Sequence, residues 1–206
     1  MIDFYLASHS ARRVELLRQI GARFQTLLLR YARPRGPDVT EDPLPGEDAI
    51  EYAARVAHDK ARRGVEAVLA RRLPRRPVLA ADTVVVVDGA ILGKPLNVDE
   101  SARCLLTLSG RSHEVVTAVT LAQPDGPQTR LWAEVSRSIV TLRAVDPDEA
   151  RRYAATGEPF DKAGGYAIQG RAAVFVTRLE GSYSGVVGLP LAETAALLAQ
   201  AGIRLF

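Results

Sequence analysis

A nearly continuous apolar run, Val78-Leu-Ala-Ala-Asp-Thr-Val-Val-Val-Val87, is the segment that most constrains the fold. A strand that is apolar on both of its alternating faces is typical of a sheet covered by helices on both sides. One carboxylate, Asp82, interrupts the run, and a lone charge there would cost several kcal/mol. We therefore expect Asp82 to pair with a lysine, to bind a metal or to act as a general base, rather than to be solvated at a strand end.

The elements predicted around this strand mix helices and strands. Strands are expected at 3–7 and 23–29, with a helix between them that ends at Gly21. Strand-helix units at the front and a hairpin in the middle indicate an α/β fold, a mixed twisted sheet flanked by helices, and 206 residues favour one domain, 1–206. The later elements are expected as a helix at 48–70, a turn at Asp88-Gly89, strands at 111–122 and 129–144, a helix from Asp146, a strand at 172–178 and a helix at 190–201.

Lysine is rare, because only three of the 27 basic residues are lysines. A lysine kept against this bias suits a crowded site that needs a compact charge rather than the planar fork of arginine. Lys60 lies on the apolar stripe of helix 48–70, where it faces the sheet and the strand of Asp82; the alternative is a side chain that reaches out from the edge of the core. Lys94 follows the hairpin and can reach the same end of the sheet, or is an ordinary turn lysine.

The segment Ser8-His-Ser-Ala-Arg-Arg13 leads from a strand into the start of a helix. Free backbone N–H groups, hydroxyls and two arginines at a helix N-terminus form a good anion pocket. The alternative is a capped helix with two solvated arginines. Two arginines in the first turn oppose the helix dipole, however, and this favours the presence of an anion.

Two further segments carry candidate site residues. The segment Asp161–Gly170 contains three glycines, which let a backbone approach a ligand closely, and Lys162. Its Gln169 offers both a donor and an acceptor, which suits reading the edge of a nucleobase; the alternative is a turn between two strands. A long loop with Pro34, Gly36, Pro37, Pro43, Pro45 and Gly46 contains Glu41, and its length marks it as functional or mobile.

Other classes of protein are disfavoured. A net charge of +3 with mixed charges, and no nucleic-acid-binding signature, predict no nucleic-acid partner. We expect neither a signal peptide nor an uncharged segment long enough to cross a membrane. The one cysteine, Cys104, is expected in the core, which is typical of a reducing compartment. We therefore predict a cytoplasmic protein. The histidines His9, His58 and His113 show no ligand spacing and are expected at the surface or in loops.

Taken together, these segments resemble the Maf family of nucleoside triphosphate pyrophosphatases. The resemblance runs from Leu6 to about Leu198, nearly the whole chain. The matching motifs are Leu6–Leu17, Ala57–Ala61, Ala81–Thr83, Gly93–Pro95, Leu108–His113, Thr117–Val119, Glu158–Gly170 and Val187–Leu191.

The resemblance implies two lobes around a cleft, a fold related to the inosine triphosphate pyrophosphatases. It implies hydrolysis of a nucleoside triphosphate between its α and β phosphates, a divalent Mg²⁺ or Mn²⁺ ion, and a possible homodimer. Asp82 matches the catalytic carboxylate, and Asp82 with Glu41 would bind the metal. The residues expected to bind substrate are Ser8, Arg12, Arg13, Lys60, Thr83, Lys94, Lys162 and Gln169.

Three of these positions differ between subgroups of the family. Arg12, Thr83 and Gln169 look like the subgroup that acts on dTTP and UTP, whereas a 7-methyl-GTP subgroup carries an aromatic residue, Gln and Glu there. A nucleotide-binding regulator of cell division is the alternative outside enzymes. The chain departs from the family pattern at Ala11, where Pro is usual. It also departs at Thr40, because the family usually has a pair of acidic residues there. Only one carboxylate of that pair, Glu41, is left to bind the metal.

Overall fold

The fold was analysed in a computed structural model, which describes residues 2–29, 38–126 and 128–206. Part of the predicted proline-rich loop, with Pro34, Gly36 and Pro37, lies outside the described residues. Within the described ranges, no helix has the length and apolar character needed to cross a membrane.

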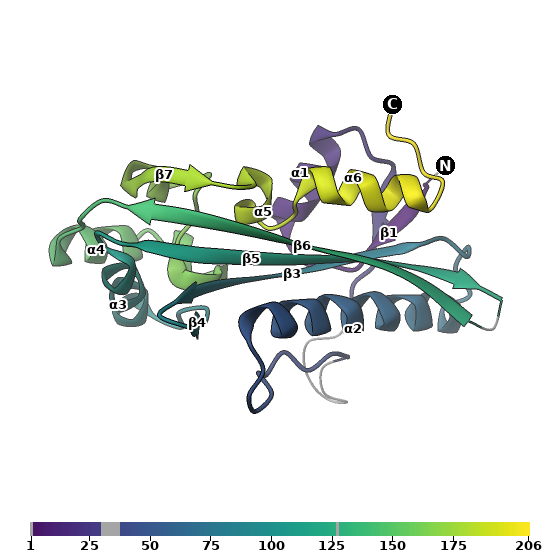
Figure 1. The fold of residues 1–206 in the computed structure, drawn as a ribbon, viewed down its shortest axis with the longest axis horizontal. Helices are drawn as coiled ribbons and strands as arrows, with labels where there is room; N and C mark the ends of the chain where they lie inside the picture. Colours follow the sequence, from purple (N-terminus) through teal and green to yellow (C-terminus); the bar gives the residue numbers. More distant parts are fainter. Residues whose placement is uncertain (1, 30–37, 127) are drawn as a thin grey trace. The chain divides into compact units, whose positions relative to one another are not determined.

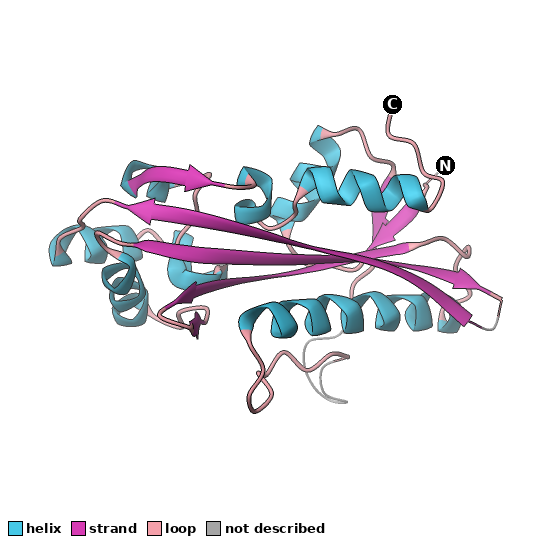
Figure 2. Cartoon of the chain, viewed as in Figure 1, coloured by secondary structure: helices cyan, strands magenta, loops and turns pink. Residues whose placement is uncertain are grey.

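In the part of the chain that the structure describes, the strands form one mixed sheet of seven strands, in the order β2-β1-β3-β5-β6-β7, with β4 paired to β3. Strands β2 and β3 both lie parallel to β1, whereas β4 is antiparallel to β3 and β7 is antiparallel to β6. This arrangement, with helices beside the sheet, confirms the predicted fold class (Figure 2). The strands are β1 (Phe4–Leu6), β2 (Phe24–Thr26), β3 (Val78–Val87), β4 (Ala90–Leu92), β5 (Ser112–Asp125), β6 (Gln128–Leu142) and β7 (Val176–Glu180).

The chain divides into two compact units, and three strands, β3, β5 and β6, contribute residues to both. The first unit comprises the chain up to Asp82, Thr117–Val135 and Gly188–Phe206. In it, helix α2 (Ala49–Ala70) covers one face of the sheet, and α1 (Ala11–Gln19) and α6 (Leu191–Gln200) lie on the other (Figure 1). A buried cluster that includes Tyr5, Leu27, Val65, Val68 and Val78 forms the core between α2 and the strands.

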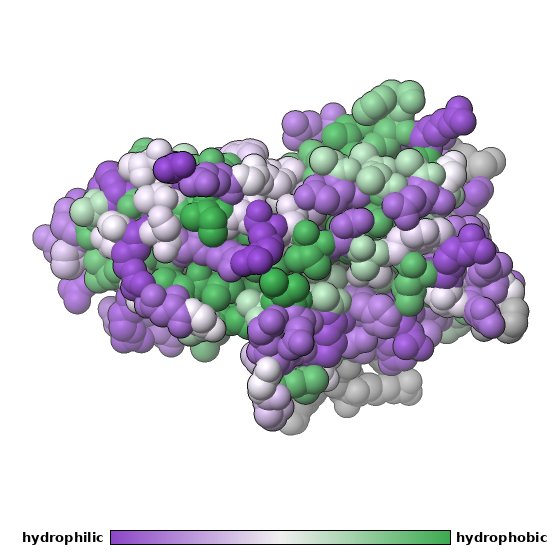
Figure 3. All heavy atoms as spheres, in the orientation of Figure 1, coloured by the Kyte–Doolittle hydropathy of each residue, from purple (hydrophilic) through white to green (hydrophobic). Residues whose placement is uncertain are grey.

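Helix α2 is amphipathic, as its sequence predicts. Asp48 caps it by accepting from the N–H groups of Ile50 and Glu51, and the Glu51 side chain completes a capping box. Its outward face is hydrophilic (Figure 3). Arg62 and Arg63 are among the exposed residues of the helix. The opposite stripe is buried and consists of Tyr52, Ala53, Val56, Ala57, Lys60, Ala61, Gly64, Val65 and Val68.

Gly64 brings α2 close to β3. A Cβ atom added at Gly64 would lie 2.5 Å from Cγ1 of the buried Val78 and 3.4 Å from Cβ of Ala7. Helix and strand therefore touch backbone to side chain at this point. The contact fixes how far α2 stands from β3, and therefore where the side chains of the neighbouring turns fall.

We expect Gly64→Ala to lower the free energy of unfolding by about 1 kcal/mol. Alanine gains about 1 kcal/mol of helix propensity, but overpacking against a stiff β-branched side chain costs typically 1–3 kcal/mol and outweighs it. Urea unfolding measures the difference. Gly93→Ala is the control, because a Cβ there meets nothing within 4 Å. A Gly64→Ala protein more stable than the wild type would contradict this account of the contact.

The second unit comprises Thr83–Val116 and Ser136–Val187. Helix α3 (Val98–Leu108) packs on α4 (Pro147–Ala154), which Asp146 caps as predicted. Short 3-10 turns at Glu158–Asp161, Ala163–Gly165 and Arg171–Phe175 follow, and α5 (Tyr183–Val187) comes after β7.

The strand predicted at 172–178 is wrong in its first half, since Arg171–Phe175 is a 3-10 turn and β7 begins at Val176. Ala172 and Phe175 are both buried, and their spacing of three matches the 3-10 period rather than the alternation of a strand. The strand predicted at 23–29 is shorter than expected, because only Phe24–Thr26 pairs with β1.

Candidate functional site

Asp82 of β3 forms a buried ion pair with Lys60 of α2. The Lys60 Nζ atom lies 2.8 Å from Asp82 Oδ1 and 2.8 Å from Glu41 Oε1. Lys60 is 5% exposed and Asp82 8%, so both charges are largely withdrawn from water. Of the three roles that the sequence left open for Asp82, pairing with a lysine is therefore present, and Glu41 joins the pair.

The register of α2 on β3 produces this pair. Gly64 lies over Val78, and one helical turn earlier Lys60 meets Asp82, four residues further along the strand. Helix and strand thus run in opposite directions at their contact. The alternation of strand side chains also places Asp82 on the face of β3 that α2 covers, while Thr83 points to the other face.

The three charges of this cluster shift the pKa values around them. Burial by itself would lower the pKa of Lys60, but the attraction of Asp82 and Glu41 outweighs it, and this pKa lies above its ordinary value. Burial and the same two carboxylates raise the pKa of Tyr52 to about 12. Lys60 therefore stays protonated and Tyr52 neutral at physiological pH. The positive charge of Arg13 also acts on Lys60, which indicates that Arg13 lies near the cluster.

Helix α2 also holds the loop that carries Glu41. The hydroxyl of Tyr52 donates to the backbone carbonyl of Glu41 at 2.6 Å. Arg55 donates to the carbonyls of Thr40 at 3.4 Å and Asp42 at 3.0 Å. The carbonyls on both sides of Glu41 are thus fixed to the helix, and its carboxylate is directed toward Lys60. Sequence reasoning missed Tyr52 and Arg55, although both precede Lys60 on the same helix.

The segment between β1 and α1 forms a hydrogen-bonded turn. The buried Ser8 hydroxyl accepts from the N–H of Ser10 at 3.1 Å and from Arg13 Nη1 at 3.4 Å. Arg13 Nε donates to the carbonyl of Gly188 at 2.7 Å, which orients the guanidinium. Arg12 and Arg13 are both half-buried in the first turn of α1. The first unit therefore contains Ser8, Arg12, Arg13, Glu41, Lys60 and Asp82 of the predicted site residues.

The other four predicted residues belong to the second unit. Thr83 is half-buried on β3, and Lys94 is exposed after β4. The ammonium of Lys162 forms an ion pair with Asp161 and donates to the carbonyl of Glu158, so its charge is engaged within its own segment. The side chain of Gln169 is exposed, although Ala167 and Ile168 before it are buried.

The donors available to a metal are carboxylate oxygens. Within the described ranges, no group of three or more His, Cys, Asp or Glu side chains converges on one point. Asp82 and Glu41 do place two oxygens around a single cation, the Lys60 ammonium, at 2.8 Å each. Oxygen ligands suit Mg²⁺ and Mn²⁺, and Mg²⁺ commonly binds through one or two carboxylates, with water and phosphate oxygens completing the shell. The chemistry of the two carboxylates is therefore of the kind that such an ion binds.

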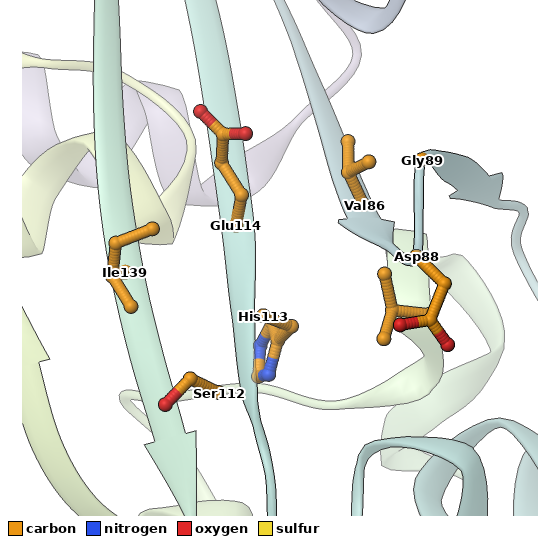
Figure 4. Close-up of a pocket in the computed structure, with 8 residues that line it drawn as sticks. Val86, Asp88, Gly89, Ser112, His113, Glu114 and Ile139 are labelled. Carbon is orange, nitrogen blue, oxygen red and sulfur yellow. The ribbon is translucent and has the colours of Figure 1, made fainter.

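A separate small hollow lies within the second unit (Figure 4). Its volume is about 210 Å³, and no predicted site residue lines it.

The expectation that His113 lies at the surface is wrong, because this residue of β5 is 3% exposed. Its Nε2 atom lies 2.7 Å from the hydroxyl of Tyr166. The residues lining the hollow are Val86, Val87, Asp88, Gly89, Ser112, His113, Glu114 and Ile139.

We expect the burial of His113 to make the protein sensitive to acid. Burial lowers the pKa of His113 to about 4, whereas the ring in an unfolded chain has a pKa of about 6.5. Between these two pKa values the unfolded chain binds a proton that the folded protein does not. The free energy of unfolding therefore decreases as the pH is lowered, by about 3 kcal/mol between pH 7 and pH 4. Urea unfolding at pH 7 and pH 4 should show this loss reduced in His113→Gln but not in His58→Gln. Equal losses in all three proteins would contradict it.

Fold and site together define an α/β protein with a buried carboxylate-lysine cluster and an arginine-bearing helix N-terminus. Residues 3–201 match the family described as Maf-like protein, and the chain belongs to this family. It is 52% identical over 202 residues to a protein of Nitrosomonas europaea named dTTP/UTP pyrophosphatase, covering 98% of this chain and 96% of the relative. Proteins with the same name from Nitrosospira multiformis and Aromatoleum aromaticum are 52% and 50% identical, with the same coverage of both chains.

Proposed function

We propose that the protein hydrolyses dTTP and UTP to the nucleoside monophosphate and pyrophosphate. The observation that carries the proposal is the buried Asp82–Lys60–Glu41 cluster, in a chain about half identical to three proteins named dTTP/UTP pyrophosphatase. The single cysteine is consistent with a cytoplasmic enzyme, because a reducing compartment keeps thiols free.

In the proposed mechanism, Asp82 orients and deprotonates the water that attacks the α phosphorus. Lys60 contacts Oδ1 of Asp82, so Oδ2 can accept the proton. The contact with the ammonium holds the carboxylate in place. A base held in place in this way contributes roughly 10²–10⁴-fold to the rate. Arg12, Arg13 and Lys94, with Lys60, would bind the triphosphate and stabilise the negative charge of the departing pyrophosphate.

A divalent ion would be held by Asp82 and Glu41. When bound, such an ion neutralises phosphate charge and polarises the phosphoryl oxygens. Ser8 and its backbone turn would contact the phosphate chain, and Lys162 is a further residue that we expect to bind substrate. Thr83 and Gln169 would read the pyrimidine, since an amide can donate to and accept from the edge of a base.

A substrate panel tests the proposal. Pyrophosphate release should be at least tenfold faster in kcat/KM for dTTP and UTP than for dCTP, GTP and 7-methyl-GTP. Hydrolysis in ¹⁸O-labelled water should place the label in the monophosphate, because attack at the α phosphorus adds the water oxygen there. Label in the pyrophosphate would overturn the mechanism, and a protein that binds dTTP without turnover would be a regulator instead. If the protein preferred 7-methyl-GTP, and Gln169→Glu increased that preference, the protein would belong to the 7-methyl-GTP subgroup instead.

A further inference from the structure

The irregular segment Glu158–Phe175 of the second unit is closed by one carboxylate. Glu158 Oε2 accepts from the N–H of Arg171 at 3.0 Å, and Glu158 Oε1 accepts from the N–H of Ala172 at 3.4 Å. These contacts join the first residue of the segment to its far end. Burial alone would raise the pKa of Glu158, but the two N–H groups, the Tyr153 hydroxyl and Lys162 lower it overall, so this carboxylate is charged at neutral pH.

Tyr153 of α4 adds a second fixed point inside the segment. Its hydroxyl donates to Glu158 Oε1 at 2.8 Å and accepts from the N–H of Ala167 at 3.2 Å. The Tyr153 side chain is 5% exposed, and its ring lies edge-on to Phe175, with centroids 5.5 Å apart. One hydroxyl therefore ties the middle of the segment to the same carboxylate that holds its end.

These contacts bracket Gln169. Ala167 is held on one side, and Arg171 and Ala172 on the other. Between them, a Cβ atom at Gly170 would lie 2.5 Å from Glu158 Oε2, so the carboxylate packs directly against the residue that follows Gln169. The backbone on both sides is thus fixed, and Gln169 extends an exposed amide from it.

A fixed backbone has a consequence for a side chain that reads a base. An amide can distinguish thymine from cytosine by offering a donor to O4 of thymine rather than an acceptor to the N4 amino group of cytosine, and a loosely held amide can rotate or shift to suit either base. Discrimination therefore depends on what holds the amide as well as on the amide itself. Residues that do not touch the base can set selectivity in this way.

We propose that Glu158 and Tyr153 are positioning residues that hold Gln169 in register with the pyrimidine edge and thereby set the preference for thymine and uracil over cytosine. The inference rests on the proposed function, because it assigns the selectivity of that same reaction. It predicts an effect on KM for dTTP rather than on the chemical step, which depends on Asp82.

The test compares Tyr153→Phe with Tyr166→Phe. Both remove one buried hydroxyl from the second unit, but the Tyr166 hydroxyl contacts His113 and not the backbone around Gln169. In Tyr153→Phe we expect the ratio of kcat/KM for dTTP to that for dCTP to fall about tenfold, the scale of one neutral hydrogen bond, mainly through KM for dTTP. Tyr166→Phe should leave the ratio within twofold of the wild type.

Two further variants separate positioning from a general loss of structure. Glu158→Gln should lower the same ratio, and Tyr153→Phe combined with Gln169→Ala should lower it no more than Gln169→Ala alone, because the amide to be positioned is gone. Hydrogen exchange should show the amide of Ala167 less protected in Tyr153→Phe and the amide of Arg171 less protected in Glu158→Gln, with neither changed in Tyr166→Phe. If the ratio stays at the wild-type value, or kcat falls equally for both nucleotides, the inference is overturned. A wild-type protein that does not hydrolyse dTTP would overturn the proposed function instead.

Discussion

Asp82→Asn is expected to lower kcat for pyrophosphate release from dTTP by about 10²–10⁴-fold while the protein stays folded. Asparagine has nearly the shape of aspartate, and its carbonyl oxygen can accept the same hydrogen bond from Lys60, which also keeps its contact with Glu41. The change removes the basic oxygen that would take a proton from water. Steady-state kinetics measure the loss, and thermal unfolding reports on the fold.

Asp59→Asn is the matched control for this change. Asp59 precedes Lys60 on α2, but its side chain is 45% exposed, and we expect its kcat to stay close to the wild-type value. If Asp82→Asn retained a kcat within tenfold of the wild type, Asp82 would not be the base. A large drop in stability alongside the loss of activity would point to a structural role for the carboxylate.

Lys60→Met is the second change with a large expected effect, a loss of about 3 kcal/mol in the free energy of unfolding. Methionine fits the apolar stripe of α2 but leaves two carboxylates close together without their shared cation. Removing one partner of a buried ion pair typically costs 3–5 kcal/mol; the lower figure applies because Glu41, 30% exposed, can turn toward water.

The interaction has a pH dependence of known sign. Because the folded pKa of Lys60 is raised, its stabilising effect is complete below the ordinary lysine value of about 10.4 and is lost as the pH rises through the folded value. Urea unfolding of Lys60→Met, Asp82→Asn and the double variant should therefore show strong coupling at pH 7, with the double variant more stable than Lys60→Met. Lys94→Met, at an exposed lysine, should change stability by no more than about 0.5 kcal/mol. A coupling energy between Lys60→Met and Asp82→Asn below about 0.5 kcal/mol would show that the ion pair does not stabilise the fold.

The sequence was most informative where charge and burial disagreed. An acid inside an apolar strand and a lysine on an apolar helix stripe each indicated an unmet partner, and the structure places these two side chains 2.8 Å apart. Helix α2 was predictable because its apolar residues recur at the helical period, whereas its capping box is a finding of the structure. The family resemblance is confirmed by the match over residues 3–201.

Contacts made by loops were not predictable. Nothing in the local sequence relates Arg55 to the carbonyls of Thr40 and Asp42, since a side chain that binds backbone groups leaves no residue pattern. The same holds for Glu158, whose carboxylate binds N–H groups 13 and 14 residues away. His113 was misjudged because a histidine near the start of a strand carries no mark of whether its side chain is buried. The roles assigned to the individual site residues, the metal, the cleft and the dimer stay predictions.

The distribution of the three lysines gives the protein a practical chemical property. Lys60 is 5% exposed and Lys162 is engaged with Asp161, whereas Lys94 is exposed. Arginines, which supply most of the positive surface charge, do not react with succinimidyl esters. Among the lysine side chains, a fluorophore carrying such an ester should thus attach to Lys94 in preference to the other two.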